Sequence, residues 1–322
     1  IKEKIPTGTS DKCRIVIATV KGDIHDIGKN IVKVLLESYG FTVYDLGKDV
    51  SPEAVLSAVL ETGCRLVGLS ALMTTTVPAM EQTIKALRKG KHVLSECVAM
   101  GTLAEGVELC RAVEESGKIY MIAENYPFSK QRMEMRRLYQ SGELGELLYG
   151  EGEYCHPMHE PFGIAPGEYH WRNQIPSTYY CTHAVAPIMY ITDTVPTKVN
   201  GFVPKIKDQS YRGNEVRLQD PGGIIMCQMS NGAVVRTMQG AFRATSMATR
   251  LHCTHGACEI NRADGRLTVW HEGFNRGNNP KYRTYEPEWP EEYAEMAAKA
   301  GHGGGDYIVG RMFIDCIKAN KQ

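Results

Sequence analysis

A histidine near the start of the chain lies in a pattern that could place it on a metal ion. Asp23, His25 and Gly28 lie in the loop Lys21-Gly-Asp-Ile-His-Asp-Ile-Gly28, which follows the apolar run Arg14–Val20. An imidazole in a loop at the carboxyl edge of a parallel sheet can ligate a metal, and a carboxylate two residues earlier can accept a hydrogen bond from its second ring nitrogen. These three residues alone favour a simpler interpretation, in which Asp23 caps the following helix and His25 is solvated.

A second motif, Ser70-Ala-Leu72, changes that balance. It follows another short apolar strand pattern, and 41 residues separate Gly28 from Ser70. Over residues 12–88 this arrangement resembles the cobalamin-binding domain of corrinoid methyl-carrier proteins and methionine synthase, which carries Asp-x-His-x-x-Gly, about forty residues, and then Ser-x-Leu. The resemblance is specific, because it rests on both motifs and on the distance between them.

The resemblance implies a role for each matching residue. His25 is expected to be the lower axial ligand of the cobalt, and Asp23 is expected to orient its ring. Ser70 would hydrogen-bond the displaced benzimidazole, while Leu72 and Thr74 would line the nucleotide slot. The cofactor implied is cobalamin, and the partner implied is a methyltransferase, because the chain has no methyltransferase barrel of its own.

Two features of the corrinoid family are missing. Its Gly-Gly pair is reduced to Gly101 in the segment Ala99-Met-Gly-Thr102, and no helical bundle precedes the motif, since only linker-like residues 1–10 stand there. A side chain in place of the missing glycine is expected to crowd the nucleotide loop.

From Gly90 onward the sequence resembles the Gfo/Idh/MocA oxidoreductases. Gly90–Cys97 and Lys118–Tyr126 resemble the fifth and sixth strands of their dinucleotide-binding domain, with Leu103–Ser116 as the helix between them, and residues 130–322 resemble their second domain. The Ser-Glu-x-x-Ala form at 95–99 is similar to a branch of this family that includes NAD-dependent glycosidases.

This second resemblance implies another set of site residues. Glu124, His156, Tyr180 and His183 match catalytic positions, and a Tyr and a His three residues apart beside a carboxylate are suitable general acid and base groups for a sugar. The alternative carries equal weight: Tyr180 and His183 would be one turn of a helix that docks the two domains.

The NAD site of such enzymes is incomplete in this sequence. There is no GxGxxG turn after the first strand, and Asp45 or Asp49 would have to take the place of the ribose-binding carboxylate, although each is more simply a solvated loop acid. Many members carry a lysine near the nicotinamide where this chain has Cys97. A thiol does not supply that positive charge, so dehydrogenase chemistry is disfavoured.

The remaining histidines and cysteines favour structural roles. The segment His252–Cys258 contains four residues of zinc-ligand type, but its alternation predicts strand, turn and strand rather than a metal site. His159 and His170 are expected to be polar pocket or surface residues. The ten cysteines include no CxxC pair, which is typical of reduced thiols in a cytoplasmic protein.

Composition excludes several classes of protein. The 322 residues carry 37 basic and 37 acidic side chains, so no excess charge favours nucleic acid or an anionic membrane. No apolar run reaches membrane-spanning length, and the start does not resemble a signal peptide. The first residue is Ile1 rather than Met, so we expect the sequence to be a fragment of a longer chain.

Alternating strand and helix patterns predict the fold. We expect a doubly wound, flavodoxin- or Rossmann-like parallel sheet over 1–128, in which 12–88 is cobalamin-binding-like and 90–128 is dinucleotide-fold-like, with one continuous sheet through the junction. Residues 129–322 should form an α+β domain with a large, open, mostly antiparallel sheet, a face that commonly joins two copies in the resembled family; a homo-oligomer is therefore expected.

The sequence leaves three functions open. The first is a corrinoid-binding methyl carrier fused to an oxidoreductase-like domain. The second is an NAD(P)-dependent oxidoreductase or NAD-dependent glycosidase that acts on a sugar. The third is an inactive hybrid, or an artefactual join, in which each cofactor site has lost part of its residues.

Overall fold

The structure of this chain is a computed structural model that describes residues 14–22, 26–38, 40–70, 92–156, 176–205, 221–242, 244–271 and 282–320. The chain divides into two compact units. Unit 1 comprises residues 1–93, 103–120 and 320–322, and unit 2 comprises residues 94–102 and 121–319. The expected domains 1–128 and 129–322 stay a prediction.

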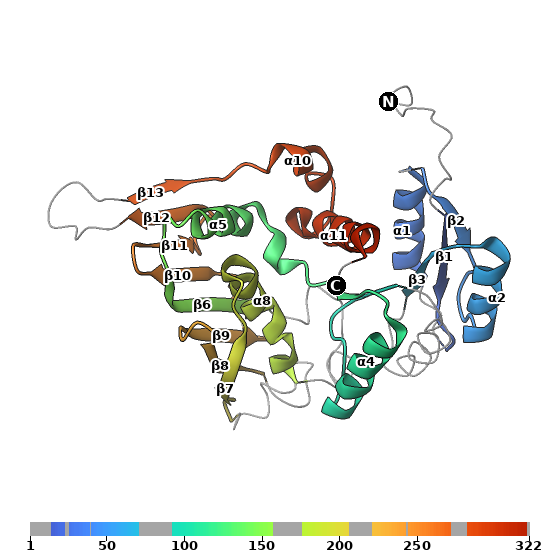
Figure 1. Cartoon of the computed structure of the whole chain (residues 1–322), viewed down its shortest axis with the longest axis horizontal. Coiled ribbons are helices and arrows are strands. Elements are labelled where there is room, and N and C mark those ends of the chain that lie inside the picture. Colours follow the sequence, from blue (N-terminus) through green and yellow to red (C-terminus); the bar gives the residue numbers. More distant parts are fainter. Residues whose placement is uncertain are drawn as a thin grey trace, which may run out of the picture. The chain divides into compact units, whose positions relative to one another are not determined.

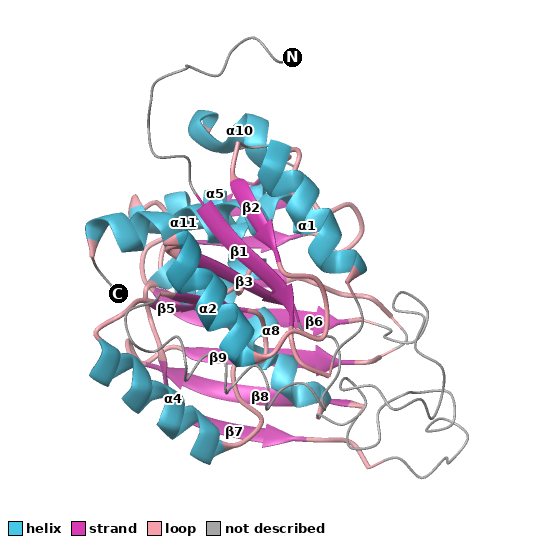
Figure 2. Cartoon of the chain, turned by 90° about the vertical axis from the view of Figure 1, so that its right-hand side faces the viewer, coloured by secondary structure: helices cyan, strands magenta, loops and turns pink. Residues whose placement is uncertain are grey.

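Unit 1 is built on a three-stranded parallel sheet with the strand order β2-β1-β3 (Figure 2). Its elements are β1 (Arg14–Thr19), α1 (Ile27–Ser38), β2 (Thr42–Asp45), α2 (Pro52–Thr62), β3 (Leu66–Ser70) and α4 (Leu103–Ser116). Helices α1 and α2 lie on opposite faces of this sheet (Figure 1). The predicted doubly wound parallel fold is therefore confirmed.

Local sequence explains how these elements begin and end. Strand β1 is the centre of the unit because its residues Val16, Ile17 and Ala18 are at most 2% exposed. Helix α2 begins after Ser51, whose hydroxyl accepts a hydrogen bond from Ala54 N, and ends at Gly63 in the left-handed region with φ of 63°.

Two further strands follow the predicted junction. β4 (Val93–Ser95) and β5 (Tyr120–Ile122) form a separate pair, and their backbone hydrogen bonds advance in the same direction along both strands, so the pair is parallel. In the described part of the chain β3 pairs only with β1, so the expected continuous sheet is not among the observed pairings. The helix expected at 78–89 lies outside the described residues.

Unit 2 is built on an eight-stranded sheet with the order β13-β12-β11-β10-β6-β9-β8-β7. All neighbouring strands are antiparallel except β6 and β9, which are parallel, so the predicted large and mostly antiparallel sheet is confirmed. The strands are β6 (Leu147–Cys155), β7 (Pro196–Phe202), β8 (Gly222–Met229), β9 (Val234–Gly240), β10 (Thr249–Cys253), β11 (Gly256–Ile260), β12 (Leu267–His271) and β13 (Tyr282–Tyr285).

Helices cover one face of this sheet. The helices of unit 2 are η2 (Tyr126–Phe128), α5 (Lys130–Gln140), η3 (Ser177–Tyr180), α8 (Cys181–Thr192), α10 (Glu291–Ala297), η4 (His302–Gly304) and α11 (Gly305–Ala319). Figure 1 shows α5 and α8 against the strands, and fully buried residues such as Leu138, Ile188 and Leu251 form the core between them. None of the helices in the described ranges is long and apolar enough to cross a bilayer.

Helix α8 approaches the sheet closely at Gly152 of β6. A Cβ atom at this position would lie 1.9 Å from the carbonyl oxygen of Ala184 in α8. Since only glycine allows this contact, the first two turns of α8 lie directly on β6. This packing fixes the position of His183, the residue before Ala184.

Candidate functional site

In unit 1 the carboxyl ends of β1 and β3 lie side by side. Thr19 pairs with Ser70 in the parallel register, and Val20 N donates a hydrogen bond to Ser70 O at 3.0 Å. Ser70, a predicted cobalamin contact, therefore ends β3 at the edge where the loop after β1 begins. Ligands of doubly wound sheets bind outside this edge.

The start of that loop is anchored by Asp49. Its carboxylate accepts hydrogen bonds from Gly22 N at 2.8 Å and from Lys21 Nζ at 3.2 Å. Gly22 has a φ of 85°, in the region that favours glycine. The Gly22 hydrogen bond holds the pKa of Asp49 below its ordinary value. Asp49 is thus an exposed loop acid, as expected, and it also anchors the start of the loop.

Asp45, the other candidate for ribose binding, is held by lysines of α1. Lys29 Nζ lies 2.7 Å from Asp45 Oδ1, and the Lys29 side chain is only 3% exposed. Lys33 Nζ approaches the other oxygen at 3.4 Å, and Gly47 N donates to Oδ1 at 2.9 Å. Burial raises the pKa of Asp45, but Lys29 and Gly47 lower it by more than burial raises it, so the pKa lies below its ordinary value. The carboxylate is occupied within unit 1, which does not fit an NAD ribose.

The other predicted cofactor contacts are placed only in part. Gly28 lies in the first turn of α1. Gly101 lies in unit 2, where its carbonyl oxygen accepts a hydrogen bond from the Tyr179 hydroxyl at 2.9 Å. The remaining predicted contacts lie outside the described residues: Asp23, His25, Leu72 and Thr74.

In unit 2 the structure brings together two of the predicted catalytic residues, Glu124 and His183. Glu124 follows β5, and His183 lies in the first turn of α8. His183 Nδ1 is 2.8 Å from Glu124 Oε2, and the two side chains are only 11% and 12% exposed. Cys97, which follows β4, donates its thiol to the same carboxylate oxygen at 3.5 Å.

Aromatic rings surround the His183 imidazole. Tyr126 stacks on it with ring centroids 4.5 Å apart, and Tyr154 meets it edge-on at 4.6 Å. Tyr180, another predicted residue, is 5.3 Å away, also edge-on. Arg132 lies over the Tyr126 ring at 5.6 Å. Tyr126, Tyr154 and Arg132 were not among the predicted site residues, because their contacts with the site join segments that lie far apart in the chain.

The charges of this group follow from burial and proximity. Burial raises the pKa of Glu124, but the hydrogen bond and the attraction of His183 lower it by more than burial raises it. The pKa therefore lies below its ordinary value of 4.5. Burial and the neighbouring Glu124 charge raise the pKa of the Cys97 thiol. At neutral pH the group therefore holds an ionised carboxylate beside a protonated thiol.

His156, the fourth predicted catalytic residue, follows β6 directly. Its backbone N donates to Gly240 O at 2.9 Å, and its ring centroid is 6.2 Å from that of Tyr154. It therefore lies next to the aromatic group. His159 and His170 lie outside the described residues.

The segment His252–Cys258 is the β10–β11 hairpin, as predicted. Leu251 pairs with Cys258, and Cys258 is fully buried. Within the described ranges, Cys97, Glu124 and His183 form a three-residue group of possible metal ligands.

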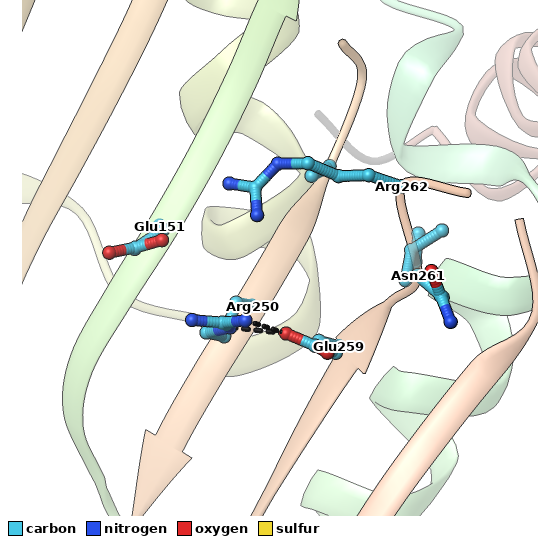
Figure 3. Close-up of a pocket in the computed structure, with 7 residues that line it drawn as sticks. Glu151, Arg250, Glu259, Asn261 and Arg262 are labelled. Carbon is cyan, nitrogen blue, oxygen red and sulfur yellow. Dashed lines mark hydrogen bonds and ion pairs between the residues drawn. The ribbon is translucent and has the colours of Figure 1, made fainter. Parts of the chain in front are cut away.

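A hollow of about 120 Å³ lies on the face of the large sheet that points away from helix α8 (Figure 3). Arg250 forms an ion pair with Glu259 there, and Arg262 Nη2 lies 2.6 Å from Glu153, a carboxylate that is 4% exposed. These charges are paired with one another, which favours a role in holding the strands together. The residues that line the hollow are Glu151, Ala248, Arg250, Glu259, Ile260, Asn261 and Arg262.

Sequence comparison connects the first part of the chain to corrinoid proteins. Residues 13–96 match the B12 binding domain family. Dimethylamine corrinoid protein 3 of Methanosarcina mazei is 42% identical over 91 residues, which are 28% of this chain and 54% of that protein. A corrinoid protein of Desulfitobacterium hafniense is 42% identical over 78 residues, or 24% of this chain and 36% of that protein. The chain thus spans about half or less of these relatives.

Structural comparison covers nearly the whole chain at low identity. Aldose-aldose oxidoreductase from Caulobacter crescentus, complexed with glycerol, has a TM-score of 0.67 and 15% identity over 97% of this chain and 91% of that one. Levoglucosan dehydrogenase, in complex with NADH and L-sorbose, has a TM-score of 0.66 and 15% identity over 96% and 90%. At such identities the likeness is one of fold.

The two comparisons agree with the two resemblances read from the sequence. The family matched by residues 13–96 binds cobalamin (B12), whereas the structure of levoglucosan dehydrogenase contains NADH. The N-terminal part of this chain is therefore homologous to the B12-binding domain of corrinoid proteins, and the chain as a whole has the fold of Gfo/Idh/MocA-type oxidoreductases.

Proposed function

We propose that this chain binds a corrinoid through residues 13–96, with His25 as an axial ligand of the cobalt, and carries a methyl group for a separate methyltransferase. The observation that carries the proposal is the spacing of Asp23, His25 and Gly28 from Ser70 within a segment that matches the B12 binding domain family. The adjacent ends of β1 and β3 in unit 1 support it, because Ser70 stands at the ligand-binding edge of the sheet.

The chain's own residues would hold and orient the cofactor. His25 would supply a ring nitrogen to the cobalt, and Asp23 would accept a hydrogen bond from the other ring nitrogen, which would fix the tautomer. The hydrogen bond from Gly22 to Asp49 fixes where the loop leaves β1. When bound, the corrinoid supplies a cobalt that takes up and releases a methyl group. The protein supplies the ligand and excludes water.

The test compares the wild-type chain with His25→Ala. Both are incubated with hydroxocobalamin and desalted, and the retained corrinoid is measured by its visible spectrum. We expect the wild type to retain the corrinoid and the variant to retain at least tenfold less, in line with the usual effect of losing a metal-site group. His271→Ala is the matched control, since His271 is 41% exposed in unit 2. A wild-type chain that retains no corrinoid would reject the proposal.

A second measurement identifies the ligand atom. The cobalt is reduced to Co(II), and its electron paramagnetic resonance spectrum is recorded with natural and with ¹⁵N-labelled histidine. Ligation by His25 predicts a nitrogen splitting that changes with the histidine label in the wild type, whereas the spectrum of corrinoid added to His25→Ala should not change with the label. Methyl carriage is then tested by reducing the cobalt to Co(I), adding methyl iodide, and following the formation of a light-sensitive methyl–cobalt species.

A second candidate function is favoured by the pair of Glu124 and His183. A carboxylate and an imidazole 2.8 Å apart, enclosed by tyrosines, can move a proton to or from a sugar hydroxyl. The fold is that of enzymes whose structures contain NADH and sugars. This candidate is an NAD(P)-dependent oxidoreductase or glycosidase that acts on a sugar. The occupied Asp45 carboxylate counts against its nicotinamide site.

Tryptophan fluorescence tests this candidate. All three tryptophans, Trp171, Trp270 and Trp289, belong to unit 2. Saturable quenching at micromolar NAD would favour the enzyme, and a flat response would count against it. If neither cobalamin nor NAD binds, the chain is an inactive hybrid.

A further inference from the structure

Three segments of unit 2 place different metal-binding side chains next to one another. Cys97 follows β4, Glu124 follows β5, and His183 lies in the first turn of α8, so successive members of the group are 27 and 59 positions apart in the sequence. Their ligand atoms all lie within 4.8 Å of one another. We propose that Cys97, Glu124 and His183 bind a zinc ion.

The distances agree with zinc coordination. With Zn–S bonds of about 2.3 Å and Zn–N and Zn–O bonds of about 2.0 Å, tetrahedral geometry separates sulfur and oxygen ligands by about 3.5 Å and nitrogen and oxygen ligands by about 3.3 Å. Cys97 Sγ and Glu124 Oε2 are 3.5 Å apart. His183 Nδ1 and Glu124 Oε2 are 2.8 Å apart, so this contact must open by about half an ångström, which a small side-chain rotation provides.

The ligand types suit zinc better than magnesium or calcium. A thiolate and an imidazole are softer ligands than the oxygens that those two cations prefer, and zinc accepts sulfur, nitrogen and oxygen together. Three protein ligands leave a fourth position open, as in zinc sites that bind a water or a substrate oxygen. The ligand at that position would be a water molecule or a hydroxyl group.

Charge balance also favours a divalent cation. Ionising Cys97 beside the Glu124 carboxylate would place two negative charges 3.5 Å apart in a half-buried site, which is unfavourable without a cation. Zinc binding would displace the thiol proton to solvent and leave one thiolate, one carboxylate and a neutral imidazole around Zn²⁺, with no net charge. Metal binding should therefore release protons and strengthen as the pH rises.

Neighbouring residues hold the ligands in place. The second oxygen of Glu124, Oε1, accepts a hydrogen bond from Tyr126 N at 3.4 Å. The His183 ring is fixed between Tyr126 and Tyr154, so its Nδ1 atom faces Glu124. Such outer contacts commonly orient the ligands of metal sites.

The test uses wild-type chain produced without cobalamin, so that corrinoid cobalt does not contribute. The protein is stripped with EDTA, dialysed against zinc, and analysed for metal by mass spectrometry. We expect one zinc ion per chain, and zinc at background level would overturn the proposal. Substitution with Co²⁺ should give the visible bands of a tetrahedral site and a near-ultraviolet band from cobalt–thiolate charge transfer.

The variant Cys97→Ser separates a true site from adventitious binding. It should lose the charge-transfer band and bind zinc at least tenfold more weakly, while Cys110→Ser, which alters an exposed thiol, should behave as wild type. If Cys97→Ser binds as wild type does, the proposal fails.

A measurement on the wild type covers the case in which Cys97→Ser does not fold. N-ethylmaleimide labelling, read by peptide mass spectrometry, should modify Cys97 faster in the EDTA-treated protein than in the zinc-loaded protein. Equal labelling rates would count against zinc. The corrinoid proposal is unaffected by either result, because it rests on His25 in unit 1.

Discussion

Each unit encloses a carboxylate next to a basic side chain, and the two pairs have different surroundings. In unit 1, Lys29 and Asp45 are 3% and 16% exposed, and the hydrogen bonds of the carboxylate come from lysines and from Gly47 N. In unit 2, Glu124 and His183 are similarly enclosed, but a thiol and three tyrosines lie next to them. The first pair joins α1 to β2, whereas the second gathers groups that can exchange protons or bind metals.

The comparison separates two meanings of a buried charge. A carboxylate whose partners are permanent cations and backbone amides stabilises the fold and has no capacity left for a ligand. A carboxylate paired with an imidazole beside a thiol retains groups that titrate or ligate. Burial alone therefore does not identify a functional site, but the chemistry of the neighbouring side chains does.

The largest effect is expected from Gly152→Val, which breaks unit 2 alone. The new side chain would meet the backbone of Ala184 and push α8 from β6, lowering the free energy of unfolding of unit 2 by about 3 kcal/mol or more. Tryptophan fluorescence in urea reports unit 2. The corrinoid spectrum reports unit 1 and should be retained. Loss of both at the same urea concentration would mean that the units do not behave separately.

Asp45→Asn tests the pair in unit 1. The variant leaves the Lys29 ammonium 3% exposed beside a neutral amide, and we expect it to lower the free energy of unfolding by about 2–4 kcal/mol. Urea denaturation followed by far-ultraviolet circular dichroism measures the change. Asp49→Asn, which alters a more exposed carboxylate, is the matched control and should have a smaller effect. Equal effects would remove the contrast between an enclosed pair and an open one.

Glu124→Gln tests the pair in unit 2 through its pH dependence. Because the folded-state pKa of Glu124 is lowered, its contribution to stability is present above pH 4.5 and is lost as the pH falls through the folded-state pKa. At pH 7 we expect the variant to be less stable by about 1–2 kcal/mol. The difference from wild type should shrink on acidification, measured by urea midpoints at several pH values. A difference that does not change with pH would contradict the charged pair.

The smallest effect is expected from Gly310→Ala in α11. No atom lies within 4 Å of the added Cβ, so the change should raise the stability of unit 2 by about 0.5–1 kcal/mol through helix propensity alone. Differential scanning calorimetry measures the shift of the unit 2 transition. A loss of stability would show that α11 tolerates less change than its open surface indicates.

Local features of the fold could be predicted from the sequence. The apolar run Arg14–Val20 predicted β1 (Arg14–Thr19), because such a signal depends only on neighbouring residues. The buried Lys29 could not be predicted, since its burial depends on Asp45, which is 16 residues away on another element.

The candidate site of unit 2 could be predicted only in part. Glu124 and His183 were found through resemblance, because no spacing rule joins residues that are 59 positions apart. Cys97 was noticed only as the replacement of a lysine. Its contact with Glu124 depends on how β4 and β5 pair, which the sequence pattern did not determine.

Tyr126 links the parts of this site in a way that bears on its evolution. Its backbone N contacts Glu124, its ring stacks on His183, and its hydroxyl donates to the Met247 sulfur at 3.2 Å. Arg132 covers the same ring. A substitution of this tyrosine would remove the ring that stacks on His183 but keep the backbone contact with Glu124, so evolution could alter the packing of the imidazole without losing that contact with the acid.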